Sequence, residues 1–332
     1  MKEKNYYHSL DLFRGFCGYG VAICHLNAFA YGNEFMEYIS LIFVEFFFVL
    51  SGFVLYPQLL KVINKKSNLL IFYKRRWIRT IPLYIFTLIM VSILTNQMFE
   101  TDFLKYFFLI QKILPNFINN DYFPVAWSLS IEELFYLLFP LILIFLNHKN
   151  FLKVSMLVFI SLILLKFFIS DNFEANFYRT GTFLRLDAIL FGFLISHFRL
   201  EVLRYKKSII FFTIIFTFIF LLSYDFFTIN KNDKDNRFLF ILFMQLISGL
   251  TLFSFLLSEP LLKTSNILKK LSLVTSQQTY SIYLFHIIII YILDKIELSI
   301  YVATPIYILV LFFISTLVYN FFEKPLLKLR PK

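Results

Sequence analysis

Ionisable side chains recur at a similar depth in five of the long apolar stretches of this sequence. They are His25, Glu45, Glu132, Glu133, Arg185, Asp187 and His286. An ionisable group inside a bilayer costs about 2.5–3.5 kcal/mol, so such groups usually face a cavity or a partner. At about 1.5 Å per helical residue, all seven lie roughly 10 Å below the same surface. The sequence therefore predicts one polar cavity, open to the outside, that the five stretches share.

A second group of polar residues lies at the opposite surface. Arg14 begins the first apolar stretch, and Arg76 and Arg79 precede the third. Residues i and i+3 share a helix face, and guanidinium groups bind phosphate in a two-point geometry that an ammonium group lacks. Arg76 and Arg79 are therefore candidates for a phosphate fork. Anchoring at the membrane surface is the alternative, and it is the preferred explanation for Lys74 and Arg75.

The distance between these two groups suits a long, thin ligand. Arg14 and His25 are 11 residues apart, which is about 16 Å along a helix. Coenzyme A carries a charged nucleotide on a thin pantetheine arm that ends in sulfur. The spacing favours such a ligand without identifying it.

The composition indicates the kind of fold that holds these residues. Hydrophobic residues make up 59% of the 332 residues, aromatic residues 21% and charged residues only 16%. A soluble domain averages roughly 45–50% apolar and about 25% charged residues. This composition excludes a disordered chain, a coiled coil, a disulfide-rich secreted scaffold and an ordinary soluble enzyme. It predicts an all-α, polytopic transmembrane bundle.

About ten apolar stretches are long enough to form the helices of this bundle. They lie near residues 11–31, 39–57, 81–98, 126–146, 152–170, 180–196, 208–224, 237–257, 272–293 and 299–321. A further stretch, 103–114, is too short to cross and carries two lysines, so we expect an interfacial or re-entrant helix there. No cleavable signal peptide and no internal repeat is recognised.

The basic residues gather in every second connecting segment, and the segment 61–79 is the richest. This bias predicts that both termini are cytoplasmic. It also explains the net charge of +11 without a nucleic-acid partner.

Lys166 is a cation within a predicted span. Cys17 and Cys24 lie one heptad apart as small core residues, and no spacing typical of metal ligands occurs, so no metal is expected.

Five sequence motifs resemble the acyltransferase 3 family of bacterial membrane O-acyltransferases. They are SLDLFRGFCGYGVAICH at 9–25, FVEFFFVLSGFVL at 43–55, RRWIRTIPLY at 75–84, WSLSIEELFYLLFP at 127–140 and YSIYLFH at 280–286. FLRLDAILFG at 183–192 and FEKP at 322–325 add weaker support. The chain departs from the family at Glu45, where Asp is usual, and at Leu134, where Gln is frequent. The family's proline shortly after His286 is also missing.

The resemblance implies ten spans in a bacterial cytoplasmic (inner) membrane. It implies acyl-CoA, most simply acetyl-CoA, as the cytoplasmic donor and a hydroxyl of a glycan or lipid-linked glycan as acceptor. It assigns catalysis to His25 and donor binding to Arg14, Arg76 and Arg79. Many relatives carry an extracytoplasmic esterase-like domain. Here we expect a single membrane domain over residues 1–332 without one.

The predicted roles in the cavity follow from the chemistry of acyl transfer. His25 acts either as the base that deprotonates the acceptor hydroxyl or as the nucleophile that carries the acyl group. Glu45 is the candidate that orients His25, and Glu132 is its rival. The remaining residues of the cavity are assigned to substrate binding, and for one of them, His286, a hydrogen-bonded core histidine is an equal alternative. The assigned residues are Glu133, Arg185, Asp187 and His286.

A multi-span transporter or flippase for a small anion or a lipid-linked sugar is the alternative function, because buried charges also mark transport pathways. The missing inverted repeat argues against it. A pure scaffold is a third interpretation, which the cost of the buried charges disfavours. Donor dependence separates the first two, since an acyltransferase consumes acyl-CoA and releases a thiol.

Overall fold

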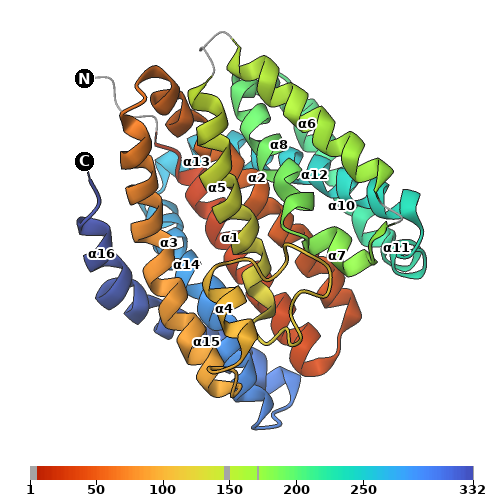
Figure 1. The fold of residues 1–332 in the computed structure, drawn as a ribbon, viewed down its shortest axis with the longest axis vertical. Helices are drawn as coiled ribbons and strands as arrows, with labels where there is room; N and C mark the ends of the chain where they lie inside the picture. Colours follow the sequence, from red (N-terminus) through yellow and green to blue (C-terminus); the bar gives the residue numbers. More distant parts are fainter. Residues whose placement is uncertain (1–5, 146–149, 170–171, 332) are drawn as a thin grey trace. The chain divides into compact units, whose positions relative to one another are not determined.

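The computed structural model describes residues 6–145, 150–169 and 172–331, and within these ranges every regular element is a helix (Figure 1). The chain divides into two compact units. The first comprises Met1–Leu50, Phe198–Asp225 and Phe243–Tyr319, and the second comprises Ser51–His197, Phe226–Leu242 and Asn320–Lys332. Two of the boundaries fall inside long helices, Glu34–Asn64 and Lys234–Leu257, so each of these helices contributes to both units.

The first unit is built on α1 and α14. Its elements are α1 (His8–His25), the π-helix η1 (Leu26–Ala30), the first part of α2 (Glu34–Asn64), α9 (Arg199–Val202), α10 (Lys206–Leu222), the second part of α12 (Lys234–Leu257), α13 (Glu259–Thr264), α14 (Asn266–Asp294) and α15 (Ile300–Val318). In Figure 1, the red α1 and the blue α14 run side by side, and these two helices contact each other along much of their length.

The second unit contains the middle of the sequence. Its elements are the rest of α2, α3 (Asn68–Leu94), α4 (Thr101–Phe107), η2 (Pro124–Ala126), α5 (Trp127–Ile144), α6 (Phe151–Phe168), α7 (Ala175–Thr180), η4 (Phe183–Arg185), α8 (Leu186–His197), the first part of α12 and α16 (Lys324–Lys328). Two further short elements, α11 (Tyr224–Ile229) and the π-helix η5 (Tyr319–Glu323), lie across unit boundaries.

Six of the described helices are long and apolar enough to cross a membrane. They are Glu34–Asn64, Asn68–Leu94, Pro124–Ile144, Phe151–Phe168, Lys234–Thr264 and Ile300–Lys328. All ten predicted stretches overlap helices, although residues 146 and 170, at two of their ends, lie outside the described residues. The chain is thus an all-helical membrane protein. The number of ten spans and the cytoplasmic termini stay predictions.

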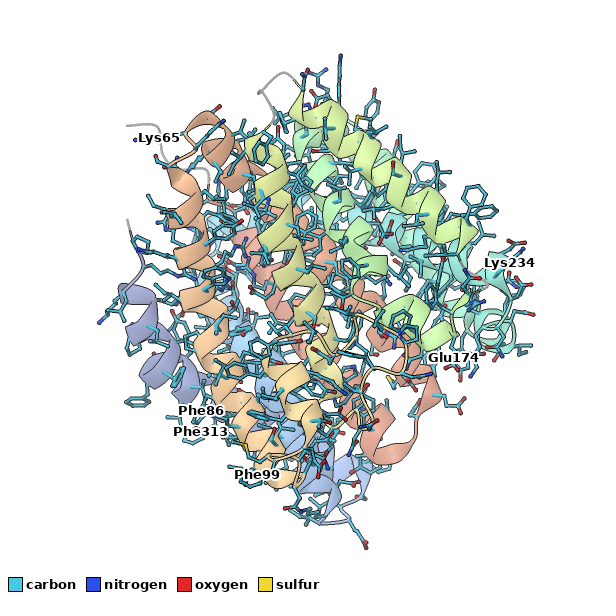
Figure 2. The ribbon with its side chains drawn as sticks, viewed as in Figure 1. Lys65, Phe86, Phe99, Glu174, Lys234 and Phe313 are labelled. Atoms are coloured by element: carbon cyan, nitrogen blue, oxygen red, sulfur yellow. The ribbon has the colours of Figure 1, made fainter. Side chains whose placement is uncertain are left out.

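Large apolar side chains are exposed on these helices and in the turn that follows α3 (Figure 2). Phe86 on α3 and Phe313 on α15 are 43% and 63% exposed, and Phe99 in the turn is 99% exposed. Charged residues such as Lys65 and Glu174 lie at helix ends instead. Exposed aromatic rings on long apolar helices are suited to lipid, since a soluble protein rarely leaves so much contiguous apolar surface in water.

The helix expected at 103–114 is shorter than predicted. The helix α4 ends at Phe107, and Leu109 adopts the left-handed conformation with φ 58°. The amide of Ile110 donates to the carbonyl of Lys105, and the amide of Leu109 donates to that of Tyr106. These bonds close the helix end, so the chain continues in turns and not as a re-entrant helix.

Glycine allows α1 and α14 to approach closely. A Cβ atom at Gly15 would lie 2.3 Å from Oγ1 of Thr275, and one at Gly18 would lie 3.1 Å from Cγ2 of Thr279. Small residues at such positions are the usual means by which membrane helices bring their backbones together. The close approach matters because α1 and α14 carry the two histidines of the candidate site.

An even closer helix–helix contact, between backbone atoms, occurs in the second unit between α2 and α8. A Cβ atom at Gly52 would lie 1.8 Å from the carbonyl oxygen of Ile189 and 2.7 Å from the amide nitrogen of Phe193. We expect Gly52→Ala to lower the free energy of unfolding by about 3 kcal/mol, because backbone atoms cannot yield as side chains do. Thermal unfolding in detergent measures this effect.

The sign of the Gly52→Ala effect is informative, because alanine in an open helix position stabilises by about 1 kcal/mol relative to glycine. Gly18→Ala is the matched control, since only a threonine methyl must move there. An unfolding temperature that is unchanged or raised in Gly52→Ala would refute the close backbone contact.

Candidate active site

Two histidines predicted to share a cavity are in direct contact in the first unit. His25 is the last residue of α1, and its Nδ1 lies 3.0 Å from Nε2 of His286 on α14. His286 is fully buried, and its Nδ1 lies 3.1 Å from the carbonyl oxygen of Ile282 and 2.8 Å from that of Tyr283. His25 is half-buried, and its ring stacks on Phe29. The pair therefore combines one enclosed imidazole and one accessible imidazole.

A π-helix and a buried tyrosine shape the backbone around the histidine pair. The α-helix changes to the π-helix η1 directly after His25, and short π-helical segments occur frequently at functional sites. The buried hydroxyl of Tyr307, on α15, donates to the carbonyl oxygens of Ala22 and His286 at 3.2 and 3.4 Å. One tyrosine thus links the two backbones that carry the imidazoles.

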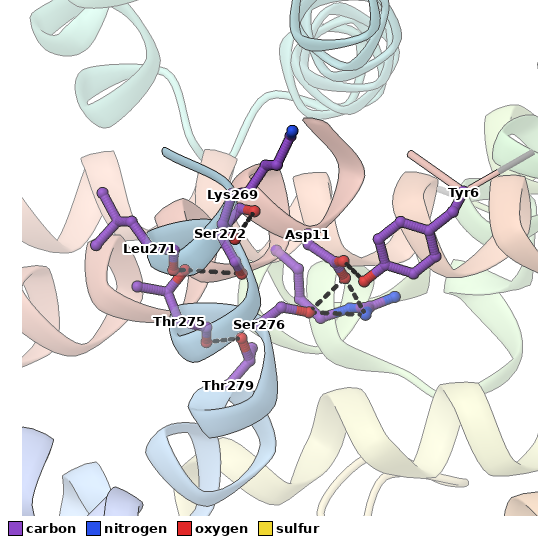
Figure 3. Close-up of polar contacts among 9 residues, drawn as sticks. Tyr6, Asp11, Lys269, Leu271, Ser272, Thr275, Ser276 and Thr279 are labelled. Carbon is purple, nitrogen blue, oxygen red and sulfur yellow. Dashed lines mark hydrogen bonds and ion pairs between the residues drawn. The ribbon is translucent and has the colours of Figure 1, made fainter. Parts of the chain in front are cut away.

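Arg14, three turns before His25 on the same helix, belongs to a polar cluster with α14. Its Nη1 lies 3.4 Å from Oδ1 of Asp11 and donates to Oγ of Ser276 at 3.1 Å. Ser276 donates to the same carboxylate at 2.7 Å, and the hydroxyl of Tyr6 donates to it as well. Figure 3 shows Tyr6 and Ser276 meeting at Asp11. Neither Asp11 nor Ser276 was identified from the sequence as part of this cluster. Asp11 could have been found, because it lies one turn before Arg14 and therefore shares its helix face.

Glu45, the residue predicted to orient His25, lies on α2 in the same unit and is 2% exposed. The contact described for Nδ1 of His25 goes to His286. The orienting role of Glu45 therefore stays a prediction.

The predicted carboxylates Glu132 and Glu133 lie in the second unit and contact different helices. Glu132 accepts hydrogen bonds from Ser51 at 2.6 Å and from Tyr136 at 3.1 Å. Glu133 is buried and accepts from Thr80, on α3, at 2.8 Å. Successive residues on a helix point about 100° apart. The adjacent residues Glu132 and Glu133 therefore contact two different helices, α2 and α3.

The predicted phosphate fork lies on α3 in the same unit. The guanidinium of Arg76 lies 4.2 Å from the ring centroid of Tyr136, a cation–π contact. Arg79 lies one turn further along and is half-buried. Arg330, which sequence reasoning missed, lies beyond α16. Burial lowers its pKa, and the nearby positive charges of Arg76 and Arg75 lower it further. This end of α3 is therefore strongly cationic.

Arg185 and Asp187 form a buried charge cluster with Lys166. Nζ of Lys166, on α6, lies 2.6 Å from Oδ2 of Asp187, and Nε of Arg185 lies 4.0 Å from Oδ1. All three residues are 1% exposed. Lys166 was recognised in the sequence only as a cation within a span, and its pairing joins two helices that are adjacent in this unit.

The predicted site residues therefore fall into two sets. Arg14, His25, Glu45 and His286 belong to the first unit, and the other six belong to the second. The single cavity predicted for seven of them, with the three arginines Arg14, Arg76 and Arg79 at the opposite surface, stays a prediction. Within the described residues, no group of three or more histidine, cysteine or acidic side chains is arranged to hold a metal ion.

Buried imidazoles and paired charges inside apolar helices define an integral membrane protein with a polar interior. A family model described as an acyltransferase domain matches residues 7–321, and the chain belongs to this acyltransferase 3 family. The protein named O-acetyltransferase OatA of Staphylococcus aureus is 31% identical over 99% of this chain. An uncharacterized protein of Haemophilus influenzae is 35% identical over 41% of it.

The chain spans 58% of the length of this Staphylococcus aureus relative. No solved structure matches the chain.

Proposed function

We propose that this protein is a membrane O-acetyltransferase that moves an acetyl group from acetyl-CoA to a hydroxyl of a cell-surface glycan or its lipid-linked precursor. The observation that carries the proposal is the contact between His25 and His286, which lies inside the region that the acyltransferase model matches. The name of the Staphylococcus aureus relative supports acetyl as the transferred group.

In this proposal, His25 performs the proton transfer. Its imidazole takes the proton of the acceptor hydroxyl as the oxygen attacks the thioester carbonyl. The tetrahedral intermediate collapses, the C–S bond breaks, and the departing thiolate takes the proton back from the imidazolium. In the alternative route the imidazole attacks first and carries the acetyl group to the acceptor. Both routes need the same accessible nitrogen on His25.

The cationic residues supply the donor side of the proposal. Arg14, Arg76 and Arg79 bind the phosphates of the donor at the cytoplasmic surface, since guanidinium groups pair with phosphate at two points. Glu45 and Glu132 assist His25, while Glu133, Arg185 and Asp187 contribute to acceptor binding. The same proposal includes ten spans, cytoplasmic termini and a bacterial cytoplasmic membrane.

Thiol release from acetyl-CoA tests the activity. Purified protein in liposomes is mixed with acetyl-CoA and a surface-glycan fraction, and free thiol is measured with and without the glycan. We expect release that depends on both substrates, and acetyl esters on the recovered glycan. If no release occurs when both the acyl donor and the glycan are varied, the proposal is wrong, and a transporter becomes the better explanation of the buried charges.

Arg76→Ala is expected to raise the KM for acetyl-CoA about tenfold or more. A charge-assisted hydrogen bond contributes about 1.5–3 kcal/mol, and the apparent affinity for the glycan should not change. Arg76→Lys keeps the charge but loses the planar fork, so it should recover only part of the affinity. Lys74→Ala is the control for general surface charge. Equal KM values in Arg76→Ala and the wild type would exclude a donor role.

A further inference from the structure

The direction of each hydrogen bond at the histidine pair follows from its partners. Nδ1 of His286 lies near two backbone carbonyl oxygens, those of Ile282 and Tyr283. A carbonyl oxygen only accepts hydrogen bonds, so Nδ1 of His286 carries a proton. His286 is 0% exposed, and full burial favours the neutral imidazole over the charged one. Its other nitrogen, Nε2, therefore carries a lone pair.

The tautomer of His25 follows from that of His286. Nε2 of His286 is an acceptor, and it lies 3.0 Å from Nδ1 of His25. Nδ1 of His25 must then be the donor, and in the neutral ring this leaves the lone pair on Nε2. A base needs its lone pair on the nitrogen that faces the substrate, and a neighbouring group commonly fixes that choice.

We propose that His286 is a positioning residue that fixes His25 as its Nδ1–H tautomer, so that Nε2 serves as the reacting nitrogen. The proposal rests on the proposed function, since it names the nitrogen that accepts the proton or the acetyl group. It adds a neutral imidazole as an orienting partner of His25, beside the assistance proposed for Glu45 and Glu132. It also replaces acceptor binding as the role of His286.

The surroundings of the pair suit a fixed hydrogen-bond chain. Both carbonyl acceptors lie one turn before His286 on α14, so they move with the ring that they orient. Tyr307 bridges the backbones of α1 and α14 beside the two histidines. The absence of a Cβ at Gly15 lets the same two helices pack closely. Rigid support of this kind holds an orienting bond at its working length.

A neutral orienting group also suits the membrane interior. A carboxylate in this position would add a buried charge, which costs several kcal/mol unless it is paired. His286 Nε2 accepts from neutral His25, and it can still accept from the imidazolium that forms during transfer. The Nδ1 proton stays on His25 throughout, so only the Nε2 proton moves between acceptor and leaving group.

Two substitutions of His286 separate positioning from packing. In His286→Gln, a side-chain amide oxygen replaces the Nε2 acceptor, while His286→Leu fills the volume without an acceptor. We expect His286→Leu to lower kcat about 100-fold or more with little change in either KM, because orientation acts in the transition state. His286→Gln should recover at least about tenfold of that loss. His197→Gln, at a histidine that contacts Tyr56 in the second unit, is the control.

If His286→Leu and His286→Gln lose kcat equally, or if the loss appears only in the KM for the glycan, the positioning role is refuted. Nitrogen-15 spectra of the protein with ring-labelled histidines give a reading that needs no activity. We expect Nδ1–H signals for both His25 and His286 in the wild type, and a shift of His25 toward Nε2–H in His286→Leu. An Nε2–H tautomer at His25 in the wild type would refute the proposal even in an active enzyme. An Nδ1–H tautomer in a protein that releases no thiol would instead overturn the proposed function.

Discussion

His25→Ala is expected to lower the turnover of acetyl transfer by about 10²–10⁴-fold, the range that a positioned acid–base group contributes. The ring is half-buried at the end of α1 and contacts the buried Nε2 of His286, so its loss should lower the free energy of unfolding by about 1–3 kcal/mol. The KM for acetyl-CoA should stay near the wild-type value. Initial rates of thiol release at saturating donor and glycan measure the effect.

The control for His25→Ala is Cys24→Ala, which changes a buried neighbour on the same helix without touching the imidazole pair. We expect Cys24→Ala to keep at least about half of the wild-type turnover, because the change is small and apolar. If His25→Ala keeps glycan-dependent release at the wild-type rate, the reacting group lies elsewhere. Glu132 and Glu133 on α5 would then be the next candidates for the reacting group.

Thiol release during the first turnover, measured with and without glycan, distinguishes the two routes for His25. A glycan-independent burst of about one thiol per protein molecule would indicate an acetyl-imidazole intermediate, because transfer to the enzyme precedes the acceptor. Release that requires glycan from the first turnover would indicate direct attack by the hydroxyl. The burst should vanish in His25→Ala if it arises on that ring.

The long helices could be predicted from the sequence because each contains a run of apolar residues, and such runs depend only on neighbouring residues. The end of α4 at Phe107 could not, because it depends on Leu109 adopting a positive φ. The division of α2 after Leu50 is also invisible in the sequence. It depends on which distant helices pack against each half.

The histidines of the site were predictable individually, but their contact was not. A histidine in an apolar stretch is conspicuous, and similar depth suggested a shared polar region. The contact between His25 and His286 joins residues 261 positions apart and depends on how closely α1 and α14 pack. The general expectation that carboxylates orient histidines points to Glu45 and Glu132, and that role stays a prediction. The contact of His25 with a second imidazole could not be foreseen in the same way.

The cluster of Lys166, Arg185 and Asp187 leads to the largest expected change in stability. One carboxylate lies within 2.6 Å of a lysine and 4.0 Å of an arginine, and all three are 1% exposed. Asp187→Asn leaves two buried cations beside a neutral amide. Removing one partner of a buried ion pair costs about 3–5 kcal/mol, so we expect Asp187→Asn to lose at least that much free energy of unfolding. Denaturant unfolding in detergent measures it.

Lys166→Met is the matched substitution, and its effect should be smaller. It removes one of the two cations beside Asp187 and leaves the other, Arg185, so one cation still faces the carboxylate. Methionine also fills most of the volume of lysine and is favourable in an apolar helix. The double variant Lys166→Met with Asp187→Asn should be more stable than Asp187→Asn alone, because it removes one of the two cations that lose the carboxylate of Asp187. Equal losses in both single variants, adding up in the double variant, would mean that the charges do not interact. The predicted asymmetry would instead show that Asp187 stabilises the bundle by balancing two buried cations, a structural role that competes with the acceptor-binding role proposed for this residue.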